Sequence, residues 1–376
     1  MLSEWDYQTR CSYLRSDGRV GSARLFDNGI TFSHTRSAIK WARPHSRRGA
    51  PAIEMVWFKA GIRQMNARIS SAHALPETIR PITIIAAPRL AERLAVNLFL
   101  ASETFQHTGS FKFRAAYSVA LRVPEDMIIA ASSGNFGQAL ACACSLLKKS
   151  CIVVMPTTSA KVKVDAVREY GARVEFVDVG VKSREERVAE LAKDYPEAYV
   201  ASGYDDPHVI LGNSSLGKEL SALKPQPDIV IVPIGGGGLS AGVILGVEHA
   251  QKKIQVIGAE PLLGNDAARS LKAGKIVRNE REPQTIADGA RTISVGERNW
   301  KILKQGLTEI VEVPEEKIAD AVRLLFALAN LKSEPTGALS VGAVMTKPDL
   351  FRDRLVCCVV SGGNVDPAVY SQLIMG

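Results

Sequence analysis

The sequence is poor in the features that mark membrane, secreted and disulfide-stabilised proteins. No apolar run approaches the roughly 18 residues of a membrane helix, and the N-terminus, with Glu4 and Asp6, lacks the apolar segment of a secretory signal. There are only six cysteines, and none has C-x-x-C spacing. We therefore expect reduced core thiols in a cytoplasmic, globular protein without a membrane partner.

The positive charge has no compact location. The formal net charge is +8, but the basic residues are scattered and form no basic-aromatic cluster beyond the first segment, so nucleic acid is not an expected partner. Residues 1–55 are rich in arginine and have little periodicity, which predicts a basic extension, either flexible or ordered only by contact. A helix is expected over residues 56–69.

Short apolar runs alternate with helical patterns after that extension. With 376 residues, 46% of them hydrophobic, the chain is long enough for two lobes. The alternation predicts βαβ units and a parallel sheet, hence an α/β fold. Strands are expected at residues 82–85, 96–100, 127–131, 151–155, 174–177, 228–234, 254–257 and from 356, and helices at 89–94, 115–120, 139–147, 160–170, 183–193 and from 239.

Lys112 occupies an unusual position for a lysine, in the stretch E-T-F-Q-H-T-G-S-F-K-F-R. Thr108 and Ser110 are candidate helix caps, which places Lys112 in the first turn of a helix. The helix dipole and partial burial both disfavour an ammonium there, and so favour a nucleophilic amine. A neutral amine beside Phe111 is suited to Schiff-base chemistry with an aldehyde cofactor; the alternative is an ordinary surface lysine.

Two small-residue turns follow predicted strands. S-S-G-N-F-G-Q, residues 132–138, turns from a strand into a helix and directs backbone N–H groups at a potential anion. An ordinary strand-to-helix loop is the alternative. The four consecutive glycines Gly235–Gly238 follow the strand at 228–234 and precede a helix starting at Leu239, which predicts a phosphate cradle.

The glycine stretch also admits a dinucleotide-binding interpretation. Gly236, Gly238 and Ala241 fit G-x-G-x-x-A, and Glu260 follows at a distance suitable for a ribose-binding acid. A nicotinamide-dependent dehydrogenase therefore stays open from this segment. Gly289 in T-I-A-D-G and Ser361 in S-G-G-N are either simple turns or ring contacts.

Together, and in this order, the four motifs S-F-K-F-R, S-S-G-N-F-G-Q, G-G-G-G and S-G-G-N resemble the fold-type II pyridoxal-phosphate enzymes, in particular the serine/threonine dehydratase and serine racemase branch. The resemblance covers residues 78–366. It implies a tryptophan synthase β-like fold of two parallel-sheet, three-layer lobes with the cofactor in the cleft between them. The implied large domain comprises residues 56–126 and 206–376, and the small substrate domain residues 127–205.

The resemblance also implies roles for single residues. Lys112 would carry pyridoxal 5'-phosphate, Asn135 would bond its ring hydroxyl, and Ser361 would meet the pyridine nitrogen. Phe111 and Gly289 would flank the ring. The phosphate would be held by Gly235, Gly236, Gly237, Gly238 and Leu239. The substrate-binding residues implied are Ser132, Ser133, Gly134, Asn135, Phe136 and Arg184.

The implied reaction is β-elimination from a β-hydroxy amino acid such as threonine, serine or 3-hydroxyaspartate, giving a 2-oxo acid and ammonia. Lys112 would remove the α-proton. Ser133 matches the residue that acts as acid/base on the opposite face in racemases, so racemisation is an alternative reaction. β-Replacement is another. A dehydrogenase and a catalytically silent protein are more distant alternatives.

The resemblance further implies a homodimer and a cation site. Glu260, the carbonyl of Gly264 and Asp266 match the family's divalent-cation ligands, and oxygen ligands suit Mg²⁺ or Ca²⁺. Three positions depart from the family pattern: Phe136 replaces a histidine, Ala101 a lysine and Ala116 a glycine. These departures put the substrate in doubt but leave the cofactor chemistry intact.

Overall fold

The computed structural model describes residues 10–14, 20–24, 78–159 and 161–376. The chain forms two compact units, Met1–Val56 and Trp57–Gly376. In the first, β1 (Arg10–Leu14) and β2 (Val20–Arg24) form an antiparallel pair. The helix predicted at residues 56–69 lies outside the described residues, as does the rest of the extension.

The larger sheet of the second unit has six strands in the order β11-β10-β9-β12-β4-β3. All neighbours pair in parallel except β3, which runs antiparallel to β4 at the edge. The prediction of a parallel sheet is thus wrong for this one strand, because β3 and β4 are joined by a short helical connection rather than a crossover. The strands are β3 (Thr83–Ala86), β4 (Leu98–Ser102), β9 (Ile229–Pro233), β10 (Gln255–Pro261), β11 (Leu307–Val313) and β12 (Val356–Val360).

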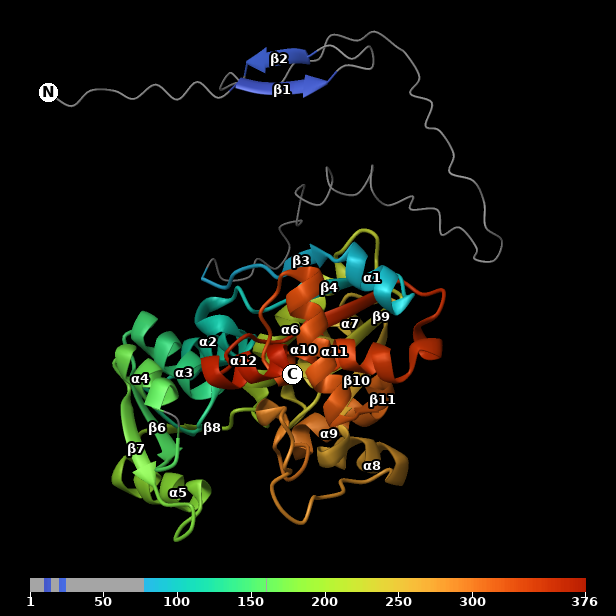
Figure 1. The fold of residues 1–376 in the computed structure, drawn as a ribbon. Coiled ribbons are helices and arrows are strands. Elements are labelled where there is room, and N and C mark those ends of the chain that lie inside the picture. Colours follow the sequence, from blue (N-terminus) through green and yellow to red (C-terminus); the bar gives the residue numbers. More distant parts are fainter. Residues whose placement is uncertain (1–9, 15–19, 25–77, 160) are drawn as a thin grey trace, which may run out of the picture. The chain divides into compact units, whose positions relative to one another are not determined.

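Both faces of this sheet are covered by helices, as Figure 1 shows. In β9, Ile229 and Ile231 join one hydrophobic cluster, whereas Val230 and Val232 join the other, because successive side chains point to opposite faces. The first face packs against α1 (Pro88–Leu94), α10 (Glu315–Ala329), α11 (Pro335–Thr346) and α12 (Pro367–Met375). The second packs against α6 (Pro207–Ser221), α7 (Gly238–His249), α8 (Asp266–Ala273) and α9 (Glu297–Gly306).

A smaller sheet has four parallel strands in the order β7-β6-β5-β8. They are β5 (Met127–Ala131), β6 (Ser150–Pro156), β7 (Arg173–Val177) and β8 (Tyr199–Ala201). One face packs against α2 (Lys112–Arg122), α3 (Asn135–Leu146) and α4 (Lys161–Glu169), and the other against α5 (Arg184–Asp194). The two sheets with their helices form two three-layer lobes, and the exact domain boundaries stay a prediction.

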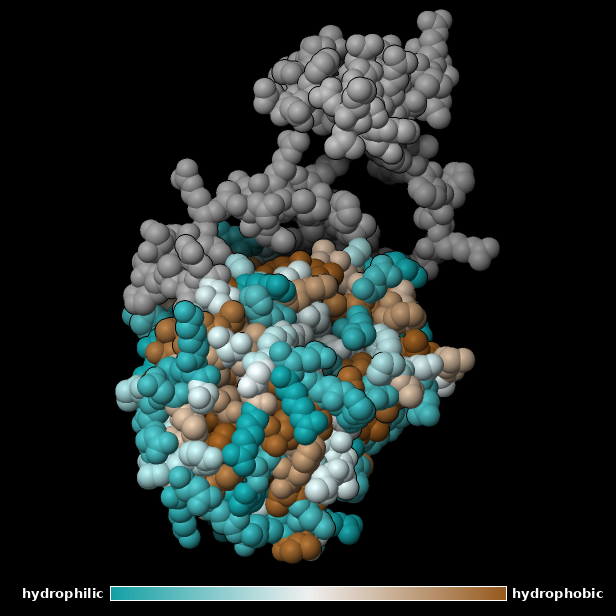
Figure 2. Space-filling model, turned by 90° about the vertical axis from the view of Figure 1, so that its left-hand side faces the viewer, coloured by the Kyte–Doolittle hydropathy of each residue, from teal (hydrophilic) through white to brown (hydrophobic). Residues whose placement is uncertain are grey.

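The smaller lobe presents a largely hydrophilic surface. Figure 2 views the molecule from the side on which this lobe lies in Figure 1, and shows charged and polar side chains with apolar ones scattered between them. Within the described residues no helix combines the length and apolarity needed to cross a bilayer. The five cysteines whose side chains the structure describes are buried and free, as expected.

The fold brings four loops to the carboxyl ends of parallel strands. The chain leaves β4 toward Lys112, β5 toward Ser132, β9 toward Gly235 and β12 toward Ser361. In α/β proteins, ligands bind outside this edge of the sheet. The predicted α/β class is confirmed, and the motifs lie where that class binds its ligands.

Candidate functional site

Lys112 is the first residue of α2, so its predicted place in the first turn is confirmed. The predicted caps are wrong: the N-cap is Phe111, and no side chain caps the helix. The reason is that Ser110 forms a β-bridge with Gly362 and the Phe111 N–H donates to the Ser361 carbonyl, 3.0 Å away. The segment before α2 thus pairs with the end of β12 instead of folding back as a cap.

The amine of Lys112 lies between two aromatic rings. Its Nζ is 5.1 Å from the ring centre of Phe111 and 5.6 Å from that of Phe136, and it donates a 2.6 Å hydrogen bond to the carbonyl of Gly203. Burial lowers the pKa of Lys112 to about 8, although the charge of Glu334 acts in the opposite direction. A substantial fraction of the amine is therefore neutral near physiological pH, as chemistry at this nitrogen requires.

Arg114 fixes the start of α2. Its guanidinium is fully buried and makes two 2.8 Å hydrogen bonds with the Glu103 carboxylate, and a 2.5 Å ion pair with Glu219. Glu219 also accepts the Ile82 N–H. The first turn of α2 is thus held by charges from the end of β4 and from α6, and motifs in the sequence did not reveal this network.

Asn135 begins α3 and belongs to a polar cluster that the sequence did not predict. Its amide nitrogen donates to both oxygens of Glu334, at 2.9 and 3.0 Å, and its amide oxygen accepts from Asn364 at 2.9 Å. Burial, with a smaller effect from Asp288, raises the pKa of Glu334 to about 7. Glu334 is thus a buried group that can take up or release a proton next to Lys112 and Asn135.

Ser361 follows β12 and has a free hydroxyl. The side chain is 1% exposed, and its Oγ has no hydrogen-bond partner in the part of the chain described. A buried hydroxyl of this kind normally has a partner. A ring nitrogen would supply one, and Ser361 adjoins Phe111 through the backbone bond given above.

The four glycines form the predicted turn into α7, which begins at Gly238. Gly237 has φ of +87°, and a Cβ at Gly236 would come within 2.2 Å of the Tyr204 ring. Among the described residues, no hydrogen bond is donated by the N–H groups of Gly235, Gly236 or Gly237. Free N–H groups at a helix N-terminus are suited to a phosphate.

The segment after β8 links this glycine turn to Lys112. Gly203 accepts from the lysine, and the next residue, Tyr204, lies against Gly236 and Gly238. Asn299 donates to the carbonyls of Tyr204 at 3.0 Å and Gly236 at 2.7 Å. Lys112 and the glycine turn are therefore connected through contacts of only two intervening residues.

Gly289 completes this side of the site. It lies in a short 3-10 helix, η4 (Asp288–Ala290), and its N–H donates to Thr336 Oγ1 at 2.9 Å. Its carbonyl oxygen would lie 2.9 Å from a Cβ placed on Gly235. Leu239, predicted with the glycines, is a buried residue in the first turn of α7.

The turn before α3 has the expected form, although α3 begins at Asn135, four residues earlier than predicted. Ser132 Oγ accepts from the N–H groups of Gly134 at 3.3 Å and Gly137 at 3.0 Å. Ser132 thus closes the turn with its own hydroxyl. The N–H groups of Ser133, Asn135 and Phe136 donate no bond among the described residues, which leaves them available to a carboxylate.

Arg184 is less closely connected to these residues. It is the first residue of α5, after the capping box formed by Ser183 and Glu186. Its side chain makes no hydrogen bond or ion pair in the described part of the chain. The structure does not bring its guanidinium into contact with Lys112 or Asn135.

The candidate cation ligands lie at the end of β10. Both Glu260 oxygens accept backbone N–H groups, from Ala267 at 2.8 Å and Ala268 at 2.9 Å. Asp266 accepts from Val295 N–H at 2.8 Å and its pKa is raised to about 6 by burial. Burial and the charge of Asp266 also raise the pKa of Glu260, so the two carboxyl groups lie near each other. Their role as metal ligands stays a prediction.

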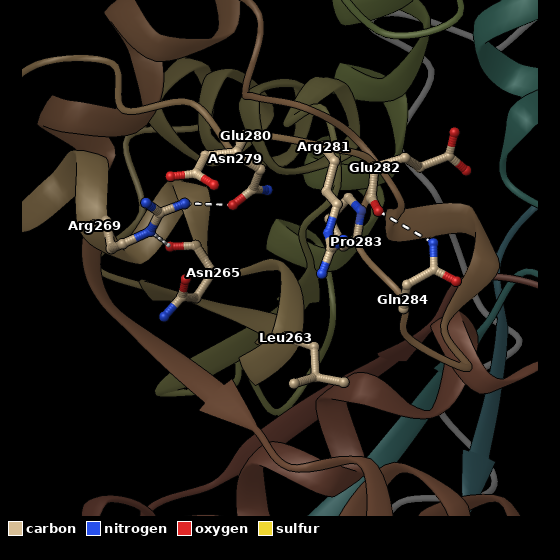
Figure 3. A pocket seen from close by; sticks show the side chains of 9 residues that line it. All are labelled: Leu263, Asn265, Arg269, Asn279, Glu280, Arg281, Glu282, Pro283 and Gln284. Atoms are coloured by element: carbon tan, nitrogen blue, oxygen red, sulfur yellow. Dashed lines mark hydrogen bonds between the residues drawn. The ribbon is translucent and has the colours of Figure 1, made fainter.

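A cavity of about 450 Å³ opens beside these carboxyl groups (Figure 3). Arg269 crosses it toward Asn279, and Leu263 lines the opposite wall. Asn279 in turn donates to Asp266 at 3.0 Å. The cavity is separate from the cluster around Lys112.

The dinucleotide interpretation is wrong for Glu260. The side chain is 1% exposed, and both of its oxygens are occupied by the N–H groups at the start of α8. Its carboxylate is therefore held at the start of α8 rather than presented to a ribose beside the glycine turn.

The residues that surround Lys112 fit pyridoxal phosphate. They provide a partly neutral amine, an unpaired buried hydroxyl at Ser361 and free N–H groups at Gly235, Gly236 and Gly237. With two three-layer α/β lobes, these features define a pyridoxal-phosphate enzyme of fold type II. The individual roles of the residues stay predictions.

Comparison with known proteins agrees with this class. Residues 75–362 match the family of the pyridoxal-phosphate dependent enzymes, and the chain belongs to this family. It is 34% identical to an L-threo-3-hydroxyaspartate ammonia-lyase of Pseudomonas sp over 82% of this chain and 97% of that protein. It is 32% identical to serine racemase of Homo sapiens, over 80% of this chain and 91% of the racemase.

A solved structure supports the same relation. A threonine deaminase from T.th. superimposes with a TM-score of 0.70 at 39% identity, covering 76% of this chain and 92% of the deaminase. The predicted family, fold class and cofactor are thereby confirmed, and so is the prediction of a pyridoxal-phosphate-dependent lyase.

Proposed function

We propose that this protein eliminates the β-hydroxyl group of a β-hydroxy amino acid and releases a 2-oxo acid and ammonia. The observation that carries the proposal is the amine of Lys112, which has a pKa of about 8 and lies between Phe111 and Phe136. Among the candidate substrates, 3-hydroxyaspartate ranks first because an ammonia-lyase of that specificity is 34% identical to this chain. Serine and threonine follow.

The chain's own residues would divide the work as follows. Bound pyridoxal phosphate supplies a ring that accepts electrons from the α-carbon of an attached amino acid. Lys112, once neutral, takes the α-proton at its Nζ. The free N–H groups of Ser133, Asn135 and Phe136 bind the substrate carboxylate at the positive end of α3.

Ser361 directs the outcome toward elimination. A hydroxyl is a neutral partner for a ring nitrogen and does not hold it protonated as an aspartate would. A ring whose nitrogen is not protonated stabilises the negative charge from the α-carbon less well. Prompt departure of the β-hydroxyl, which takes up that charge, is then favoured. Glu334, with a pKa of about 7 and bonded to Asn135, is a nearby group able to exchange a proton.

A racemase is the second candidate function. Ser133 lies in the same turn as Asn135 and has a hydroxyl, and serine racemase of Homo sapiens is 32% identical to the chain. A second acid/base on the face opposite Lys112 would return the α-proton with inverted configuration. Ser133 is the residue proposed for that task.

The two functions are separated by their products. Purified protein with pyridoxal phosphate is incubated with L-threo-3-hydroxyaspartate, L-serine and L-threonine, and 2-oxo acid, ammonia and the D-enantiomer are measured. An ammonia-lyase gives equal amounts of 2-oxo acid and ammonia, and Lys112→Ala abolishes both. Ser133→Ala should remove any D-enantiomer and leave elimination. If the wild type forms no 2-oxo acid from any of the three, the proposed function is wrong.

We also propose that Glu260, the Gly264 carbonyl and Asp266 bind Mg²⁺ or Ca²⁺. The proposal is supported by two carboxyl groups that lie near each other and whose pKa values are raised mainly by burial, because oxygen ligands of this kind suit a hard divalent cation. Calcium should raise the melting temperature of the wild type but not of Asp266→Asn. We also propose a cytoplasmic location, and, as the family resemblance implies, a homodimer, whose mass light scattering can test.

A further inference from the structure

An ion pair joins the two lobes beside the candidate site. Lys163 lies on α4, against the four-stranded sheet, and Asp288 begins η4 on the side of the six-stranded sheet. The Lys163 Nζ and Asp288 Oδ2 are 2.9 Å apart, and the side chains are 34% and 42% exposed. Both partners are therefore reachable from solvent.

The pair adjoins the residues that surround Lys112. Asp288 directly precedes Gly289, which contacts Gly235 of the glycine turn and bonds to Thr336. Thr336 lies two residues after Glu334 on the same segment. The ion pair thus lies at the edge of the site, next to the residues that contact the glycine turn.

Both charges also act on the centre of the site. The negative charge of Asp288 raises the pKa of Glu334, and the positive charge of Lys163 lowers it. Glu334 in turn contacts Asn135 and influences Lys112. The electrostatic effects and the contacts thus both indicate that Lys163 lies close to the polar cluster of Asn135 and Glu334.

We infer that Lys163 binds the side-chain carboxylate of a dicarboxylic β-hydroxy amino acid, and that Asp288 is its partner when no such substrate is bound. The inference rests on the proposed function and names the substrate class. A substrate carboxylate would replace the Asp288 carboxylate, so the ammonium exchanges one anion for another. A partly exposed ion pair is weak, so the exchange costs little.

Arg184 is the competing cation. It lies on α5, which packs against the face of the four-stranded sheet opposite α4. Its charge is not among the main influences on the pKa of Glu334, whereas the charge of Lys163 is. Lys163 is therefore better located than Arg184 for binding a second carboxylate.

The test compares two neutralised cations in the holoenzyme. Lys163→Gln and Arg184→Gln, the variant of the competing cation, are assayed with L-threo-3-hydroxyaspartate and with L-serine, and the ratio of the two kcat/KM values is taken. Lys163→Gln should lower this ratio by about 10-fold, mainly through KM for the dicarboxylic substrate, because the second carboxylate of that substrate loses its cation. Arg184→Gln should lower it less than about 3-fold, and Lys163→Arg should restore part of the loss.

Asp288→Asn tests the exchange itself. Without the competing carboxylate, Lys163 is free, and KM for 3-hydroxyaspartate should fall several-fold while KM for L-serine rises or stays level. The inference is overturned if Lys163→Gln leaves the ratio intact, or if Arg184→Gln lowers it more.

A binding measurement keeps this test separate from the activity. Calorimetry with succinate and propionate, neither of which can react, should give tighter binding of the dicarboxylate to the wild-type holoenzyme and a loss of about 10-fold in Lys163→Gln. Equal binding of both acids to the wild type would overturn the inference even if the protein proves to be a lyase. If the protein prefers succinate but has no lyase activity, the carboxylate-binding role of Lys163 would be supported and the proposed function refuted.

Discussion

Lys112 and Glu334 form an opposed pair of titrating groups. Burial favours the neutral form of both, and lowers the pKa of the amine to about 8 while it raises that of the carboxyl to about 7. The charge of Glu334 works against this by stabilising the ammonium. Above pH 7, Glu334 is ionised and holds the pKa of Lys112 higher than burial alone would.

This opposition predicts the pH dependence of cofactor attachment. The amine reacts only when neutral, so the rate at which pyridoxal phosphate becomes fixed by borohydride should rise with pH, with a midpoint near pH 8. Glu334→Gln removes the charge that stabilises the ammonium, so the midpoint should move to lower pH. Glu316→Gln, an exposed residue of α10, is the control with the same change of charge. A midpoint that moves upward in Glu334→Gln would contradict the account.

At the residue scale, the sequence predicted what depends on local pattern. Lys112, Ser361 and the glycine turn could be predicted because each lies in a loop that follows a recognisable strand and contains small residues. Glu334 could not, because it contacts Asn135, a residue 199 positions away in the chain. The prediction that Thr108 and Ser110 cap the helix was wrong for a similar reason. Local sequence does not reveal that this segment pairs with residues after β12.

Helix α2 depends on a buried charge for its position. Burial raises the pKa of Glu103, but Arg114 opposes this, and Glu219 shares the same guanidinium. One arginine thus stabilises two carboxylates that have no other cation within the described contacts. Removing it leaves both buried without compensation.

Arg114→Met should therefore destabilise the protein by about 3–5 kcal/mol, measured by urea unfolding. Arg352→Met breaks the exposed pair with Asp349, whose side chains are 71% and 83% exposed, and should change stability little. Adding Glu103→Gln and Glu219→Gln to Arg114→Met should recover part of the loss. An equal cost for Arg114→Met and Arg352→Met would mean that the network does not anchor α2.

The glycine turn makes a second prediction for an element. A Cβ at Gly236 would overlap the ring of Tyr204, so Gly236→Ala should displace the turn and weaken pyridoxal-phosphate binding by at least about 10-fold. Titration followed by absorbance measures this. Tyr204→Ala in the same chain makes room for the methyl group, and the double variant should bind more tightly than Gly236→Ala alone. No recovery would show that the overlap with the Tyr204 ring is not the cause of the weaker binding.

At the level of elements, the positions of strands in the sequence were easier to predict than the direction in which neighbouring strands pair. The residues of β5, β6 and β9 were located from continuous apolar runs, because strands covered on both faces need apolar side chains on both. The antiparallel direction of β3 could not be predicted, because a strand's direction is set by its connection and neighbours rather than its residues. The helix start at Asn135 was missed because small polar residues also form loops.

At the scale of the molecule, the region that matches the pyridoxal-phosphate family, residues 75–362, falls inside the unit Trp57–Gly376. Every residue of the candidate site lies between Lys112 and Asn364 in that unit, apart from Phe111 directly before it. The basic extension predicted from the sequence corresponds closely to the other unit, Met1–Val56. All of the candidate site thus belongs to one unit of the chain.

A chain of residues 57–376 should therefore bind pyridoxal phosphate with nearly the affinity of the full chain. Absorbance titration and borohydride trapping measure this, and Lys112→Ala in the shorter chain is the control for specific attachment. Because a ligand that binds only the folded state stabilises it in proportion to its affinity, saturating cofactor should raise the melting temperature of both chains by a similar amount. A shorter chain that folds but fails to bind would show that residues 1–56 contribute to the site.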